Sequence, residues 1–232
     1  MSSSLDPRTP VVVGAAEVVH RDGPDFTPIS ATELMIEAVR EALESTGAAA
    51  AVGTNVGMVL VPHGTWTESD PGRAVAAAIG APAARSIRSE LGVLQQSLLA
   101  RATAEVVSGV IDVAVVVGGE NRWSGVAAAK GGLEVPAAPD LATTGEPDEV
   151  IAPKEMVISP IEIERNLTTA AHQYAIIESA LRHHLGRSIG AHQRELGALW
   201  SRFARIAADA PASWDTRSMS AEEIAFESDT NR

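Results

Sequence analysis

The stretch SELGVLQQSLLARATAEVVSGVIDVAVVVGGEN, from Ser89 to Asn121, decides the fold class of this chain. Apolar side chains stand on almost every face of the segment between Gly92 and Gly109, which predicts a helix that is buried on all sides. The run VIDVAVVVGG that follows is continuously apolar, as is typical of a strand in a parallel sheet that is covered on both faces. The stretch therefore predicts an α/β layered domain with a mostly parallel sheet around a buried helix, Gly92–Ser108.

Strands and helices also alternate before this stretch. The β-branched run Pro10–Val19 predicts a buried strand. A helix follows over ATELMIEAVREALESTG, with Ser30 as its N-cap and Glu33 completing a capping box. Further on, VGMVLVPHG predicts a strand, Pro71–Gly80 a short helix and ARSIRSE a weaker strand. We expect these elements to form one α/β domain over residues 8–122.

The composition changes from Trp123 onward. Residues 125–153 are rich in Gly, Ala, Pro and Thr without a period, which predicts a long irregular excursion. Two amphipathic helices follow, the first stopped by Gly186 and the second by Pro211, and then a short capped segment, SAEEIAF. We assign residues 123–232 to a loop and helical excursion inserted beside the α/β domain.

Charge and composition exclude several classes of partner and site. The net charge of −12 and pI near 4.9 argue against nucleic acid and against an anionic membrane surface. The 232 residues include no cysteine, so disulfides, zinc–thiolate sites and a cysteine nucleophile are excluded. The N-terminus lacks the pattern of a signal peptide, and we expect a cytoplasmic protein.

No local motif identifies a catalytic site. The turn VVVGGENR lacks the phosphate-binding glycine patterns. The six histidines have no partners at metal-ligand spacing, which predicts solvated surface residues and no metal site. Ser97 lies within the predicted buried helix, where its hydroxyl is expected to bond to the preceding turn. Glu17 and Glu120 follow strands and offer a pair for acid–base chemistry, although solvated or capping roles are favoured over it.

Several segments together resemble the thiolase superfamily, in particular the sterol-carrier-type and thiolase-like type 1 acetyl-CoA acetyltransferase relatives of actinobacteria. The segments that carry the resemblance are TPVVVGAAEVV, DPGRAVAAAIGAP, SELGVLQQSLLARATAEVVSG, DVAVVVGGENR and YAIIESALRHHLGRSIGAHQRELGALWSRFARIAADAPASW. They cover nearly the whole chain.

The resemblance implies a site at the start of the buried helix. Its nucleophilic cysteine position falls on Gly92, so no catalytic residue carries over, and Gly92, Val93 and Gln95 are the expected substrate-binding residues. The implied ligand is CoA or an acyl-CoA, with no covalent cofactor. Glycine keeps the backbone donors of a helix start and removes the nucleophile.

The family has two similar halves, and the resemblance implies that the last strand of the first half is missing from the domain over residues 8–122. This chain is therefore expected to be half a protein that associates with the missing half or with further copies of itself. Two functions stand from the resemblance. The first is an acyl-CoA acyltransferase of the acetyl-CoA acetyltransferase class, here with little or no thiolase activity. The alternative is a non-catalytic scaffold or partner-binding subunit of a lipid or sterol acyl-CoA degradation complex. A weaker third hypothesis is a nucleotide-binding α/β domain unrelated to thiolases. We expect the Gly92–Ser108 helix to distinguish them, since exposure of one of its faces would contradict the thiolase assignment.

Overall fold

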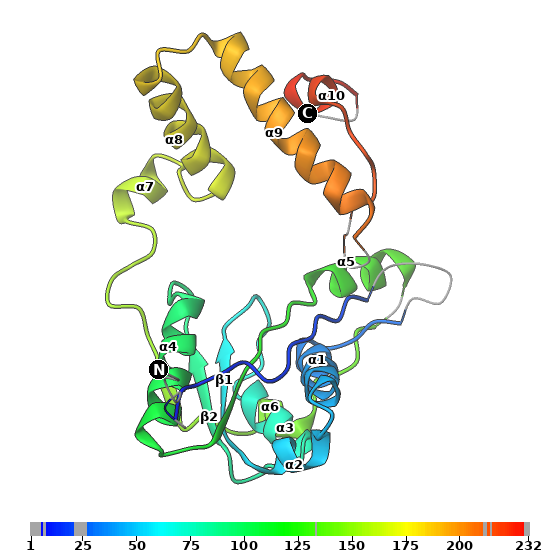
Figure 1. Cartoon of the computed structure of the whole chain (residues 1–232). Coiled ribbons are helices and arrows are strands. Elements are labelled where there is room, and N and C mark those ends of the chain that lie inside the picture. Colours follow the sequence, from blue (N-terminus) through cyan, green and yellow to red (C-terminus); the bar gives the residue numbers. More distant parts are fainter. Residues whose placement is uncertain are drawn as a thin grey trace, which may run out of the picture. The chain divides into compact units, whose positions relative to one another are not determined.

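The computed structural model describes residues 6, 8–20, 27–132, 134–210, 213 and 215–229. Contacts divide the chain into two compact units (Figure 1), unit 1 at Met1–Val157 and unit 2 at Ile158–Arg232. Unit 1 holds every described strand, and unit 2 contains helices. The division falls later in the chain than the boundary between residues 122 and 123 that the change in composition suggests.

Unit 1 is built on a four-stranded, all-parallel sheet, which confirms the α/β fold class. Its strands are β1 (Val56–Pro62), β2 (Arg85–Ser89), β3 (Val113–Val116) and β4 (Glu149–Ile151). They lie in the order β3-β1-β2-β4. The β4 strand lies within residues 125–153, where the sequence predicts an irregular excursion. That prediction is wrong for β4 and for the parts of this range that form helices, Arg122–Gly131 and Asp140–Thr143. A strand this short at the edge of a sheet needs no apolar run, and only its pairing with β2 reveals it.

Six described helices accompany the sheet in unit 1. They are α1 (Ala31–Ser45), α2 (Ala49–Thr54), α3 (Pro71–Ala78), α4 (Gln95–Ser108), α5 (Arg122–Gly131) and α6 (Asp140–Thr143). The capping box of α1 is confirmed, because Ser30 Oγ accepts from the backbone N–H of Glu33 at 3.2 Å and the Glu33 carboxylate accepts from the N–H of Ser30 at 3.4 Å.

The two faces of the sheet bury different sets of side chains. Val59 and Val61 of β1 point to the side of α1 and α3, within the larger apolar cluster. Met58 and Leu60 alternate with them and pack with Ile87 of β2 against Leu98 of α4. Because side chains alternate between the two faces along a strand, the face on which each later residue of β1 and β2 lies follows from its position.

The α4 helix is covered on one face only, so the prediction of burial on all sides is wrong. Leu98 is its only buried residue, whereas Leu99 is 48% exposed, and Ser97 is exposed rather than enclosed as predicted. The sheet of unit 1 covers the face that carries Leu98, and no described segment of unit 1 buries the opposite face. Apolar residues on every side of a helix predict burial, but each face is buried only where another segment packs against it.

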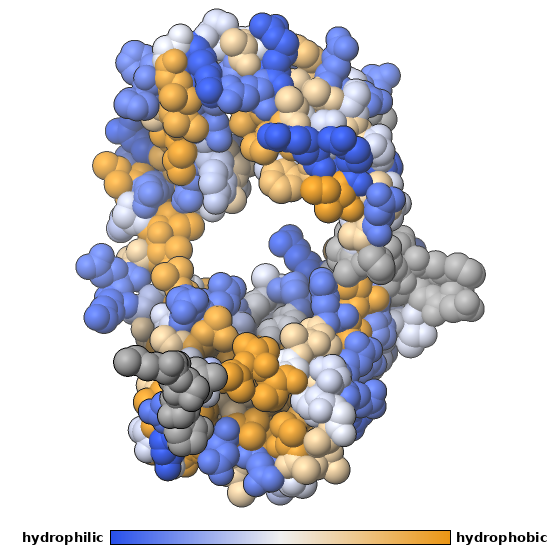
Figure 2. Space-filling view, viewed as in Figure 1, coloured by the Kyte–Doolittle hydropathy of each residue, from blue (hydrophilic) through white to orange (hydrophobic). Residues whose placement is uncertain are grey.

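The segment Pro10–Val19 is not a strand, contrary to the prediction. Val12 is 87% exposed, and among the described residues no backbone hydrogen bond joins the segment to a strand. Residues 13–16 nevertheless border a cavity of about 240 Å³ together with β3 and α1. Apolar side chains reach the surface of unit 1 in several places, and Figure 2 shows orange surface on the face of this unit turned to the viewer.

Unit 2 contains α7 (Pro160–Glu164), α8 (Ala170–His184), α9 (Ile189–Ala208) and α10 (Ala221–Ala225). The two long helices and the capped SAEEIAF segment are therefore confirmed. Gly186 separates α8 from α9 with φ of 63°, a conformation that favours glycine at a helix end. Pro211, predicted to follow the second helix, lies outside the described residues. Across the residues that the structure describes, no helix combines the length and the apolarity that crossing a membrane requires.

Candidate functional site

Polar side chains meet where β1 and β2 end, at the carboxyl edge of the sheet. His63 follows β1 directly and Glu90 follows β2 directly. The His63 Nδ1 atom lies 3.7 Å from Glu90 Oε2, and Arg88 Nη2 donates to Glu90 Oε1 at 2.9 Å. Parallel α/β sheets gather their sites at this edge, so we take His63, Arg88 and Glu90 together as the edge cluster.

Strand alternation explains why these three side chains meet. Along β1, His63 continues the row of Val59 and Val61, and along β2 Arg88 and Glu90 lie on the same face. The backbone N–H of His63 also donates to the carbonyl of Ser89, the neighbouring residue of β2, at 2.9 Å. Both ends of the cluster are thus fixed by the sheet.

Trp66 holds the imidazole of His63 from one side. Its ring meets that of His63 edge to face, with centroids 4.6 Å apart. Trp66 is itself buried, and its indole Nε1 donates to the carbonyl of Gly119 at 3.0 Å. The loop after β1 is therefore anchored to the loop after β3, and the orientation of His63 is restricted.

Three polar atoms at this edge are enclosed without a hydrogen bond in the described part of the chain. They are His63 Nδ1, Arg88 Nε and Ser89 Oγ. Leaving a buried donor or acceptor unpaired costs about 1–3 kcal/mol per group. Such groups are rare in structural cores and common where a ligand or an ordered water completes the bonding.

Glu120, the acid–base candidate after β3, is occupied by backbone donors. Its carboxylate accepts from the N–H of Thr65 at 2.8 Å, and also from the N–H groups of Asn121 and Arg122. Partial burial acts to raise the pKa of Glu120, but these bonds and that from the Thr65 hydroxyl outweigh it and lower the pKa. Glu120 therefore ties two loops together as an ionised group. Glu17 is exposed, and no described contact joins it to Glu120.

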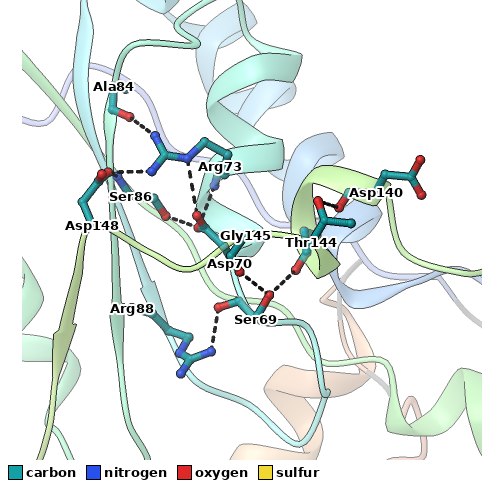
Figure 3. Close-up of polar contacts among 11 residues, drawn as sticks. Ser69, Asp70, Arg73, Ala84, Ser86, Arg88, Asp140, Thr144, Gly145 and Asp148 are labelled. Carbon is teal, nitrogen blue, oxygen red and sulfur yellow. Dashed lines mark hydrogen bonds and ion pairs between the residues drawn. The ribbon is translucent and has the colours of Figure 1, made fainter.

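A polar network lies on the same side of the sheet and supports the edge cluster (Figure 3). Asp70 caps α3 through the N–H of Arg73 at 3.0 Å and accepts from the hydroxyl of Ser86. The guanidinium of Arg73 donates to Asp148 at 2.8 Å, and Asp148 also accepts from the N–H of Ser86 at 2.7 Å. Arg88 joins the network by donating to the carbonyl of Ser69 at 2.6 Å. The network links β2, the start of α3 and the chain that enters β4.

The three substrate-binding residues expected from the resemblance lie in and after the turn that follows β2. Gly92 has φ of +97° and precedes α4, so it is not a residue of the helix. Val93 is half-buried, and its N–H donates to the carbonyl of Glu90 at 3.2 Å, while Gln95 is exposed at the first position of α4. A Cβ added to Gly92 would overlap the side chain of Val157. Both the backbone conformation and the space at residue 92 therefore disfavour any side chain.

The prediction of solvated histidines is wrong for His192 and incomplete for others. His192 of α9 is 7% exposed, and its Nε2 lies 2.7 Å from a carboxylate oxygen of Glu178 on α8. His20 is half-buried beside Glu37 at 2.8 Å, whereas His183 and His184 are exposed. The periodicity of a helix predicts on which side of that helix a histidine lies. It does not predict that a carboxylate of another helix lies within hydrogen-bonding distance of the histidine. No group of three His, Asp or Glu side chains among the described residues could hold a metal ion.

The comparisons with known proteins point to one fold. Over 99% of its length the chain superposes on the crystal structure of a monomeric SCP2-thiolase-like protein type 1 from Mycobacterium smegmatis, with a TM-score of 0.70 and 26% identity. This chain has a thiolase-like fold. The match covers 41% of the solved chain, so the present sequence spans about two fifths of that protein's length. No family model and no curated protein matches the sequence.

The comparison confirms the thiolase-like type 1 resemblance that the sequence predicts. The expectation that exposure of one face of the Gly92–Ser108 helix would contradict the thiolase assignment is wrong, because one face of α4 is exposed in a thiolase-like fold. The unrelated nucleotide-binding hypothesis is not supported.

The sequence alone does not identify the edge cluster. A signal is present, because His63 and Glu90 each lie at the end of a predicted strand, in VGMVLVPHG and ARSIRSE. Only the order of strands in the sheet makes β1 and β2 neighbours and so brings His63 beside Glu90.

Proposed function

We propose that this thiolase-like chain binds CoA or an acyl-CoA at the turn after β2 and does not form an acyl-enzyme there. The observation that carries the proposal is the backbone of Gly92, at the position that corresponds by resemblance to the thiolase nucleophile. Its φ of +97° and the neighbouring Val157 side chain disfavour any side chain at this position, and the chain holds no cysteine. Losing the nucleophile of a concerted site typically costs several orders of magnitude in rate.

Acetyl-CoA and free CoA test this proposal directly. Calorimetry is expected to detect weak binding of both, with Kd of about 0.1–1 mM. Intact-protein mass measurement after incubation with acetyl-CoA is expected to show the unmodified mass, whereas a stable acetyl adduct would refute the proposal.

Adjacent glutamines of α4 supply a matched pair of variants. Gln95 is the expected contact and Gln96 is its neighbour in sequence, and both are exposed. We expect Gln95→Ala to weaken CoA binding about 5-fold, the loss of roughly one hydrogen bond, and Gln96→Ala to leave it unchanged. Equal effects of the two changes would place the ligand elsewhere.

The second candidate function is a non-catalytic scaffold or partner-binding subunit of a lipid or sterol acyl-CoA degradation complex. The uncovered face of α4 favours it, because Leu99 and Val107 present apolar surface there. Absence of CoA binding, together with self-association or capture of a thiolase-like partner, would favour this function over the first.

A further inference from the structure

The imidazole of His63 presents two different sides. Its Nδ1 is enclosed and faces Glu90, while the side chain as a whole is 22% exposed. The exposed part of the ring is therefore the opposite side, which carries Nε2. No described group forms a hydrogen bond with Nε2, so this nitrogen is available to a ligand or to water.

The neighbours of His63 favour one protonation pattern. A carboxylate that faces Nδ1 stabilises the tautomer with the proton on that nitrogen and leaves Nε2 as an acceptor. Arg88 fixes the other oxygen of Glu90 at 2.9 Å, and Trp66 restricts the ring. The separation of 3.7 Å is longer than a hydrogen bond, as catalytic contacts often are before a ligand binds.

The charged groups around the ring come from two loops. Glu90 and Arg88 face it from the end of β2. Glu120 lies beside the chain next to His63, because its Oε2 would be 3.1 Å from a Cβ added to Gly64. The Glu120 carboxylate already accepts hydrogen bonds from the backbone N–H groups of Thr65, Asn121 and Arg122. Glu90 is therefore the carboxylate that can accept a hydrogen bond from the imidazole.

We infer that His63 is the general base of a water-dependent hydrolysis of an acyl-CoA thioester at this edge, with Glu90 as its positioning residue. The inference rests on the proposed acyl-CoA binding, and Gly92 lies in the same turn as Glu90. The oxygen of water bonds to the thioester carbonyl carbon while Nε2 of His63 takes one of its protons. The C–S bond then breaks and the departing CoA thiolate takes that proton from the imidazolium, giving a carboxylic acid and CoA thiol. No acyl-enzyme forms, so the reaction needs no cysteine.

Because the chain contains no cysteine, a thiol assay for released CoA has no background from the protein. Released CoA can be followed with a thiol-reactive chromophore without reaction of the 232-residue chain itself. We expect slow release of CoA from acetyl-CoA, with a rate that rises with pH, as a general-base mechanism requires. Calorimetry on the same samples measures binding separately.

Three variants separate the roles. His63→Gln is expected to lower the hydrolysis rate by about 10²-fold or more, to abolish the rising pH limb and to change acetyl-CoA affinity less than about 3-fold. Glu90→Gln is expected to lower the rate about 10-fold and to displace the limb. It should also change the imidazole tautomer seen by ¹⁵N NMR. His20→Gln removes a histidine that also lies beside a glutamate, Glu37, and should leave rate and pH profile unchanged.

Each result bears on a different claim. Binding without CoA release above the uncatalysed rate would overturn the hydrolysis and leave the proposed function intact. Absence of binding of both acetyl-CoA and CoA would overturn both. A His63→Gln variant that keeps the pH limb, or an imidazole tautomer unaffected by Glu90→Gln, would refute the assigned roles of this pair.

Discussion

Leu60 of β1 and Ile206 of α9 both occupy the apolar positions of a clear periodic pattern, yet Leu60 is fully buried and Ile206 is 68% exposed. The difference extends to the two units that contain them. Unit 1 buries two apolar clusters, one on each face of its sheet. In unit 2, His192 and Gly197 are the buried residues among those that the structure describes. Periodicity thus places an apolar face on a helix, but only a packed neighbour removes that face from water.

The largest expected difference between the units is in hydrogen exchange. Amides of β1 should exchange about 10³-fold or more slowly than those of α8, because opening β1 requires disruption of the core whereas α8 carries no buried residue. Exchange followed by mass spectrometry of peptides from the native chain measures this. Equal protection would mean that α8 acquires a buried face in solution.

Core substitutions sharpen the same comparison. We expect Leu60→Ala to lower the free energy of unfolding by about 2–5 kcal/mol, since it leaves a cavity between the sheet and α4. The matched change Ile206→Ala in unit 2 should alter it by less than about 0.5 kcal/mol. Urea denaturation of each variant provides the measurement, and a large effect of Ile206→Ala would show that this side chain is covered in solution.

Substitution of Gly92 tests whether the turn tolerates a nucleophile. Gly92→Cys should destabilise unit 1 by about 1–3 kcal/mol, because a residue with a Cβ is strained at φ of +97° and meets Val157. It should also fail to produce an acetyl adduct. Gly125→Cys is the control, since an added Cβ has no neighbour within 4 Å there. A stable, acetylated Gly92→Cys protein would mean that the turn readily adopts another conformation.

A smaller effect is expected at Asp148, whose pKa is lowered chiefly by the hydrogen bond from the backbone N–H of Ser86 and further by Arg73, against partial desolvation. Because the folded state favours the ionised carboxylate, the stabilisation is complete above about pH 4 and is lost as the pH falls. Asp148→Asn should therefore lower Tm by about 2–4 °C at pH 7. The difference from the wild type should shrink toward pH 3. A difference independent of pH would assign the effect to packing alone.

Local sequence determined a large part of this protein. The capping box at Ser30 and the spacing of α8 and α9 satisfy backbone hydrogen bonds through nearby residues alone, and the apolar runs of β1 and β3 mark these segments as strands. The glycine at residue 92 is likewise a property of the sequence, and the resemblance to thiolases predicts that it occupies the position of their nucleophile.

Only the tertiary structure decided which of these faces are covered and which side chains meet. The run Pro10–Val19 has the composition of a strand but does not pair, because a strand needs the hydrogen-bonding edge of another segment at the right distance. β4 is three residues long and pairs nonetheless, since the edge of β2 is free to receive it. His63 and Glu90 lie 27 residues apart and come together because β1 and β2 are adjacent and parallel and end at the same edge.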